Sequence, residues 1–205
     1  DRLVGFEGQF IVAGLGDTLM INGTLDPYLE VPAQMVRFRV VNASAERGYY
    51  FGLSGGRSFQ LIGTDGGLLE RPLTKDRMLV TPGERLDVVV DLSDANGATV
   101  DLMAFNSELT GIDIPGSANG PGGGNALNGL DLKLVELRVG APNADPATAL
   151  PAELQAVPRL TEAQATRTRT VRMTGAPPSP FLLDDQEFDH GVINHTVDLN
   201  AVEIW

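Results

Sequence analysis

The stretch MVRFRVVN, residues 35–42, decides the fold of this chain. Charged and hydrophobic side chains alternate along it, with Arg37 and Arg39 on one face. The other face carries Val36, Phe38 and Val40. A period of two is the period of a β-strand, because successive side chains of a strand point to opposite sides of the sheet. The stretch therefore predicts a half-buried strand with its arginines turned to solvent.

Similar short runs lie on both sides of this stretch, separated by turns rich in Gly, Asn and Asp. The predicted strands cover residues 18–21, 49–53, 59–63, 78–80, 85–91, 99–104 and 132–139. No long helix is predicted, and one short helical turn is expected at most, in residues 141–158. Many short strands joined by tight turns are typical of a β-sandwich or barrel.

Glycine-rich connections separate these strands. Ser54-Gly55-Gly56 is predicted to be a hairpin tip, and Asp65-Gly66-Gly67 a tight turn in which glycine supplies a positive φ at little steric cost. The long connection Asn106–Asn128 predicts a mobile surface loop. Its run Gly120–Gly124 lacks the Lys-Ser/Thr that follows the glycines of a phosphate-binding loop.

The composition changes near residue 140. Residues 141–167 begin with an Ala- and Pro-rich stretch, which predicts an interdomain linker. Short predicted strands then return, the first over Arg167–Met173. We therefore expect one β-domain over residues 1–140, a linker over 141–167 and the first strands of a following domain over 168–205.

Charge and composition exclude several classes of function. The chain has 15 Lys and Arg against 27 Asp and Glu, a net charge of -12, so it lacks the basic surface that a nucleic-acid partner requires. No apolar run reaches the ~20 residues that span a bilayer, so no membrane partner is expected. The absence of cysteine excludes disulfides and thiolate metal sites.

Residues that could bind a metal are few. The chain has two histidines, His190 and His195, in a predicted strand-turn-strand segment. Four carboxylates lie close by in the sequence: Asp184, Asp185, Glu187 and Asp189. A structural metal site needs about four converging ligands, and a solvated polar turn is the favoured interpretation of this segment. The sequence therefore assigns no catalytic, cofactor-binding or metal-binding residue.

Five segments resemble, in order, the signatures of laccase-like multicopper oxidases around their second domain. Gly16–Gly23 resembles the Gly-Asp-x-x-x-x-Asn-Gly opening of that domain, and Arg37–Arg47 resembles its arginine-rich strand followed by Asn-x-Ser-x-x-Arg. Ile62–Glu70 and Pro82–Asp91 resemble the next two signatures, and Phe181–Trp205 is similar to the entry into the third domain. Five such segments in this order form a specific pattern, although each is short.

The resemblance implies an all-β, cupredoxin-like Greek-key sandwich or barrel. In this family, copper ions are held by His-x-His pairs of the first domain and by His and Cys motifs of the third, whereas the second domain binds none. The resemblance therefore implies no cofactor in this chain and copper in its parent protein. That parent would oxidise phenols or metal ions and reduce O2 to water, and this chain alone would be structural and catalytically incompetent.

Two other functions stay open. A copper-free relative of the cell-division type would use the same three-domain body as a scaffold or binding protein, and an unrelated β-sandwich binding module is a third reading. The expected partners are the flanking cupredoxin domains of the parent, with a homodimer possible through the truncated strands of residues 168–205. Family resemblance implies a periplasmic or secreted location. Arg47 is expected to tie its turn to a neighbouring carboxylate.

Overall fold

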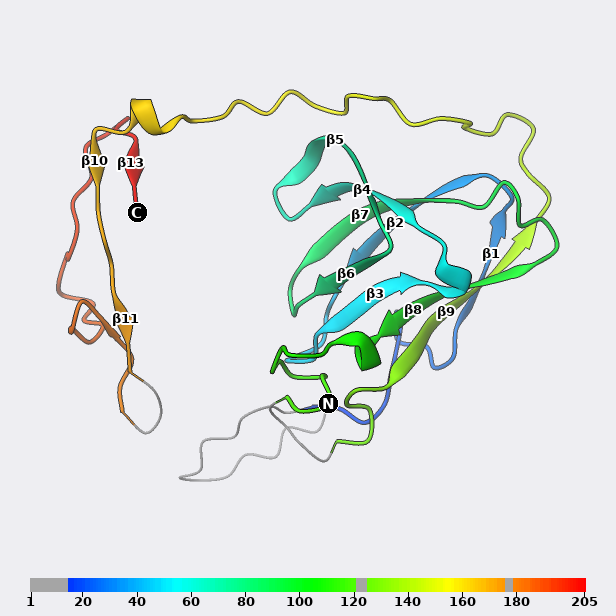
Figure 1. Cartoon of the computed structure of the whole chain (residues 1–205), viewed down its shortest axis with the longest axis horizontal. Helices are drawn as coiled ribbons and strands as arrows, with labels where there is room; N and C mark the ends of the chain where they lie inside the picture. Colours follow the sequence, from blue (N-terminus) through cyan, green and yellow to red (C-terminus); the bar gives the residue numbers. More distant parts are fainter. Residues whose placement is uncertain (1–14, 121–124, 176–178) are drawn as a thin grey trace. The chain divides into compact units, whose positions relative to one another are not determined.

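The computed structural model describes residues 15–120, 125–175 and 179–205. The chain divides into two compact units, unit 1 over Asp1–Ala156 and unit 2 over Val157–Trp205 (Figure 1). The predicted glycine run of residues 121–124 and part of the proline-rich turn after Gly175 lie outside the described residues. None of the short helical turns in the described ranges is long or apolar enough to cross a membrane.

Unit 1 is built from two β-sheets, whose strands Figure 1 labels. The five-stranded sheet has the order β1-β9-β8-β3-β6, and the four-stranded sheet has the order β2-β7-β4-β5. The strands are β1 Tyr28–Pro32, β2 Met35–Val41, β3 Tyr49–Leu53, β4 Phe59–Thr64, β5 Gly67–Lys75, β6 Arg77–Val80, β7 Arg85–Asp91, β8 Thr99–Phe105 and β9 Asp131–Gly140. Strand pairs are antiparallel except β1 and β9, which run parallel. Because the chain passes repeatedly from one sheet to the other, unit 1 is the all-β, cupredoxin-like Greek-key sandwich that the sequence predicted.

Strand β2 has the geometry that its alternation predicted. Arg37 and Arg39 are exposed, and the intervening hydrophobic side chains are half-buried and pack against the core. Arg37 pairs with Asp87 of the neighbouring strand β7, its hydrogen-bonded neighbour in the sheet. Strand β2 therefore has one charged face toward solvent and one apolar face toward the core.

The core lies between the two sheets. Phe51 of β3 and Phe59 of β4 belong to different sheets, and their rings meet edge to face with centroids 5.3 Å apart. Strand β7 contributes Val88 and Val90, both fully buried. Burial of this apolar surface, at ~25 cal/mol per Å², is the main source of the stability of unit 1.

Three local predictions need correction. Ser54-Gly55-Gly56 is a 3-10 turn rather than a hairpin tip, because β3 and β4, which it joins, lie in different sheets. Residues 18–21 form no strand, and only Ile21 makes an isolated bridge, to Thr24. Strands β1 and β5 were not predicted: each contains a proline and lacks the regular alternation of β2.

The connection after β8 is held more firmly than its composition predicted. It begins with the 3-10 turn Asn106–Glu108. Asn106 is completely buried, accepts a hydrogen bond from Tyr50 N and donates to Gly48 O. Ser117 is also buried and bonds Ile114 O. The described part of this connection is therefore an anchored loop, and the mobility expected of the whole stretch stays a prediction.

The described part of unit 2 contains four strands of two residues each. Strand β10, Arg167–Thr168, pairs in parallel with β13, Glu203–Ile204. Strand β11, Met173–Thr174, pairs antiparallel with β12, Leu182–Leu183. The single strand predicted over residues 167–173 is therefore wrong, since the stretch divides between two separate sheets.

Candidate functional site

One candidate site of unit 1 is built on the turn between β2 and β3. Asn42 at the end of β2 is buried and donates from Nδ2 to the carbonyl oxygens of Arg47, at 2.7 Å, and Val80, at 2.9 Å. Its Oδ1 accepts the backbone N–H of Ser44 at 3.0 Å, which is the geometry of an Asx turn. One amide side chain thereby fixes the turn and the position from which Arg47 extends.

Arg47 connects three segments that lie far apart in the sequence. Arg47 is only 3% exposed to solvent. Nη1 donates to Asn128 Oδ1 at 2.9 Å, and Nη2 donates to Asn125 Oδ1 at 2.8 Å and Gly16 O at 3.0 Å. Asn125 in turn donates to the carbonyls of Leu15 and Gly16. The guanidinium of Arg47 thus forms a structural tie: its hydrogen bonds connect the β2–β3 turn to the first described residues and to the loop before β9.

The acceptors of Arg47 differ from the one expected. The sequence predicted a carboxylate partner, but the partners in the described part of the chain are two amide oxygens and a carbonyl oxygen. Burial penalises the charged form, so desolvation lowers the pKa of Arg47 from its usual value. A charged group held by neutral oxygens is a structural tie and is poorly suited to acid–base chemistry.

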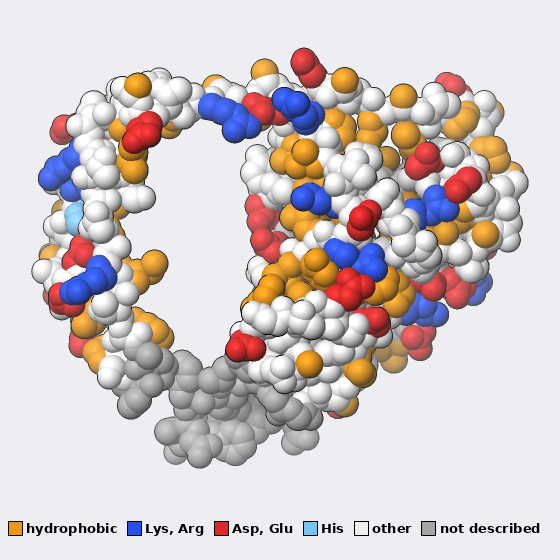
Figure 2. All heavy atoms as spheres, in the orientation of Figure 1, with side chains coloured by type: hydrophobic (Ala, Val, Ile, Leu, Met, Phe, Trp, Pro, Cys, Tyr) orange, Lys and Arg blue, Asp and Glu red, His pale blue; other side chains and the backbone are white. Residues whose placement is uncertain are grey.

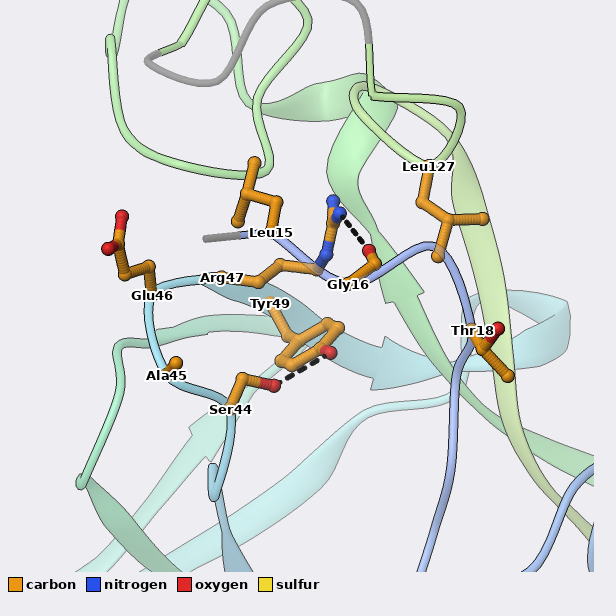
Figure 3. Close-up of a pocket in the computed structure, with 9 residues that line it drawn as sticks. All are labelled: Leu15, Gly16, Thr18, Ser44, Ala45, Glu46, Arg47, Tyr49 and Leu127. Carbon is orange, nitrogen blue, oxygen red and sulfur yellow. Dashed lines mark hydrogen bonds between the residues drawn. The ribbon is translucent and has the colours of Figure 1, made fainter. Parts of the chain in front are cut away.

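A small polar cavity lies beside this tie (Figure 3). Its volume is about 30 Å³, and its walls include Thr18, Ser44 and Tyr49 next to Arg47. The hydroxyl groups of Ser44 and Tyr49 are hydrogen-bonded to each other at 3.0 Å. A space of this size accommodates one or two water molecules and excludes any organic substrate. The cavity is therefore large enough for water between the segments that Arg47 connects, and too small for a substrate.

A second, open groove of about 560 Å³ lies at the ends of β1, β8 and β9. Glu30 and Arg138 are the charged residues of its wall, and the rest is mainly small side chains. Arg138 is already engaged, because it lies over the Tyr28 ring and donates to Glu136. The groove offers a shallow surface and no convergent set of reactive groups among its lining residues.

The histidine and carboxylate segment of unit 2 does not converge on a common point. His190 packs edge to face on Phe188, and His195 packs edge to face on Trp205. Asp184 and Asp185 occupy a turn with positive φ, where they bind the backbone N–H and the guanidinium of Arg172 respectively. Within the described ranges no three His, Cys, Asp or Glu side chains gather as a metal ion would require.

The donors that copper needs are therefore not assembled in the described residues. Copper sites of this kind use several imidazoles, with a thiolate in the mononuclear centre. The chain has no cysteine and two histidines, and each histidine packs against the aromatic ring of a different residue. These residues do not fit a copper ion.

Sequence reasoning missed the two asparagines that hold Arg47. Asn125 and Asn128 lie in a Gly/Asn-rich stretch that reads as an ordinary loop. This stretch has no periodic pattern, and only folding brings the two asparagines next to residue 47.

The sequence profile of the multicopper oxidase family matches residues 8–108, which include β1 to β8 and Arg47. A laccase of Bacillus stratosphericus is 31% identical over 194 residues, which are 93% of this chain and 35% of the laccase. A cell division protein FtsP of Edwardsiella tarda is 42% identical over 106 residues, 50% of this chain and 22% of that protein. The chain thus spans about a third or less of the length of these relatives.

Solved structures give the same result for the fold. The multicopper oxidase McoA of Aquifex aeolicus superposes with a TM-score of 0.66 at 28% sequence identity, over 84% of this chain and 35% of McoA. The alternation along β2, the two-sheet sandwich and these similarities agree with one another. This chain belongs to the multicopper oxidase family and contains a cupredoxin-like domain of it.

Proposed function

We propose that this chain is the copper-free middle domain of a three-domain multicopper oxidase and acts as a structural spacer. The observation that carries the proposal is the donor inventory: two histidines, no cysteine and no gathering of ligands in the described residues, on a fold of the copper-oxidase family. The domain would hold its neighbours at the separation that their shared copper centre requires.

Unit 2 supports the view that further domains are the partners of this chain. Its apolar side chains are exposed, as Phe188 at 82% and Leu199 at 93% illustrate, and Figure 2 shows hydrophobic side chains on its surface. Exposed apolar patches mark surfaces that another layer covers. We assign this layer first to a flanking cupredoxin domain of the longer protein.

The activity follows from the same assignment. The laccase relatives support a parent that oxidises phenols or metal ions and reduces O2 to water with copper supplied by the other domains. The chain's own residues would position those domains and carry out no chemical step. A periplasmic or secreted location is part of this proposal.

Copper analysis tests the proposal on the chain itself. The protein is incubated with Cu²⁺, dialysed against a mild chelator and measured by elemental analysis, beside His190→Ala and His195→Ala. We expect far less than one copper per chain in all three samples. One tightly held copper per chain that is lost in either variant would overturn the assignment.

A second candidate function has its own support. The FtsP of Edwardsiella tarda has the higher identity over a shorter match, 42% over 106 residues, against 31% over 194 residues for the laccase of Bacillus stratosphericus. This favours a copper-free three-domain scaffold of the cell-division type. The longer protein distinguishes the two: bound copper together with phenol oxidation supports the oxidase, whereas a folded protein without either supports the scaffold.

A further inference from the structure

The chain contains four asparagine residues that are each followed by glycine. They are Asn22, Asn96, Asn119 and Asn128. Asparagine before glycine is the pair most prone to deamidation, because the glycine has no side chain to shield its backbone nitrogen. That nitrogen can attack the side-chain amide of the asparagine, and asparagine is accordingly among the thermolabile residues of proteins.

The structure separates these four pairs by the state of the attacking nitrogen. Gly97 N donates to Val139 O at 2.8 Å, Gly120 N to Ser117 O at 3.3 Å and Gly129 N to Gly116 O at 2.9 Å. In each case a hydrogen bond must break before the nitrogen can react. For Gly23 no acceptor lies within hydrogen-bonding distance among the described residues.

The surroundings of Asn22 also favour reaction. Asn22 and Gly23 have φ angles of 50° and 78° and form the tip of a tight turn that is closed by Ile21 and Thr24. Both residues are exposed, and a Cβ placed on Gly23 would meet no atom within 4 Å. Water and the asparagine side chain therefore reach the Gly23 nitrogen freely.

We propose that Asn22 is the site at which the folded chain deamidates first. The Gly23 nitrogen forms a bond to Cγ of Asn22, the Cγ–Nδ2 bond breaks, and Nδ2 leaves as ammonia with the proton of the Gly23 amide. Water then opens the resulting cyclic imide at one of its two C–N bonds. The products are aspartate or isoaspartate at position 22.

The modification has a structural consequence. Isoaspartate lengthens the main chain within the turn, and the turn is held by the two hydrogen bonds between Ile21 and Thr24, each 2.9 Å long. Ile21 is one of the side chains that pack against the core of unit 1. Ageing at Asn22 therefore loosens a covering segment of the sandwich and adds a negative charge to it.

Mass spectrometry of the folded chain tests the proposal. The protein is held at mildly alkaline pH and 37 °C, digested at intervals, and the four sites are assigned from fragment ions. We expect Asn22 to react at least about fivefold faster than each other pair, the ratio that corresponds to one net hydrogen bond of about 1 kcal/mol. In guanidinium chloride the four rates should converge, because the hydrogen bonds that protect the other glycines are lost.

Asn22→Gln is the matched variant, since it keeps an amide at the turn but needs a less favourable six-membered ring. It should abolish the fast reaction of the folded chain and leave the three slow sites unchanged. A folded chain in which another pair reacts first, or in which all four react at equal rates, would overturn the proposal. Circular dichroism at each interval confirms that the sample is folded.

Discussion

Unit 1 and unit 2 contain similar proportions of hydrophobic residues and use them in opposite ways. All of the buried hydrophobic side chains of the described residues lie between Val31 and Val139, in unit 1. In unit 2 no described residue is buried, and most of its large apolar side chains between Met173 and Trp205 are exposed. A sheet stabilises a domain only when a second layer covers its apolar face, and unit 1 has both layers.

Strand length follows the same division. The strands of unit 1 have four to ten residues, and those of unit 2 have two. Two-stranded ribbons without a covering layer are marginal in water. Unit 2 is also held by an ion pair, in which Arg169 Nε donates to Glu203 Oε2 at 2.6 Å, and Arg169 Nη2 donates to Thr196 O. The comparison predicts different responses of the two units to the same kinds of change.

The largest difference is expected from truncating a leucine in each unit. Leu137 of β9 is fully buried, so Leu137→Ala should lower the free energy of unfolding by about 2–5 kcal/mol. Leu199 is 93% exposed, so Leu199→Ala should change it by no more than about 0.5 kcal/mol. Urea denaturation of both variants measures the two changes in the free energy of unfolding. Equal effects would show that the two units do not differ in packing.

The second expected effect concerns the tie at Arg47. Arg47→Met removes three hydrogen bonds from a charged donor and should cost about 1.5–3 kcal/mol of unfolding free energy. Arg37→Met is the matched control, because Arg37 makes an ion pair on the exposed face of β2, and such pairs contribute about 1 kcal/mol or less. If the two variants lose the same stability in urea, Arg47 is not a tie of the fold.

A smaller effect is expected when acid protonates Glu203 in unit 2. The hydrogen bond from Arg169 lowers the pKa of Glu203 below its ordinary 4.5. The pair therefore contributes its full stability above that value and loses it as the pH falls through the lowered pKa. Trp205, the one tryptophan of the chain, lies beside Arg169 and reports the change by fluorescence.

Glu203→Gln supplies the control for this titration. The variant should fluoresce alike on both sides of the transition, because its side chain no longer titrates. A transition that persists unchanged in Glu203→Gln would assign it to another carboxylate.

The smallest effect on unit 1 is expected from removing the strands of unit 2. Deleting residues 168–205 should leave the unfolding free energy of unit 1 within about 0.5 kcal/mol, because its buried core ends at Val139. The same deletion should convert any homodimer of the isolated chain into a monomer in sedimentation, since the exposed apolar strands are the proposed contact. A mass that is monomeric before and after the deletion would rule out this pairing.

Much of the sandwich could be predicted from local pattern. Strand β2 and strand β7 were located from alternation and apolar runs, and their bounds agree with the structure to within a residue. Strands β1 and β5 escaped prediction, because each contains a proline and lacks regular alternation. The partner of β1 is β9, about a hundred residues away along the chain, and the local sequence of β1 does not indicate this pairing.

The amino-acid sequence by itself determined the all-β class, the family resemblance and the shortage of copper ligands, because alternation, turn chemistry and residue inventory are local or compositional properties. Tertiary structure alone decided that Arg47 binds Gly16, Asn125 and Asn128 and no carboxylate of the described residues. It also decided that Gly23 is the one glycine of four Asn-Gly pairs without a backbone acceptor in that part of the chain. Both outcomes depend on which distant segments meet. That choice is made by the packing of two sheets around one core, and it leaves no periodic trace in the sequence.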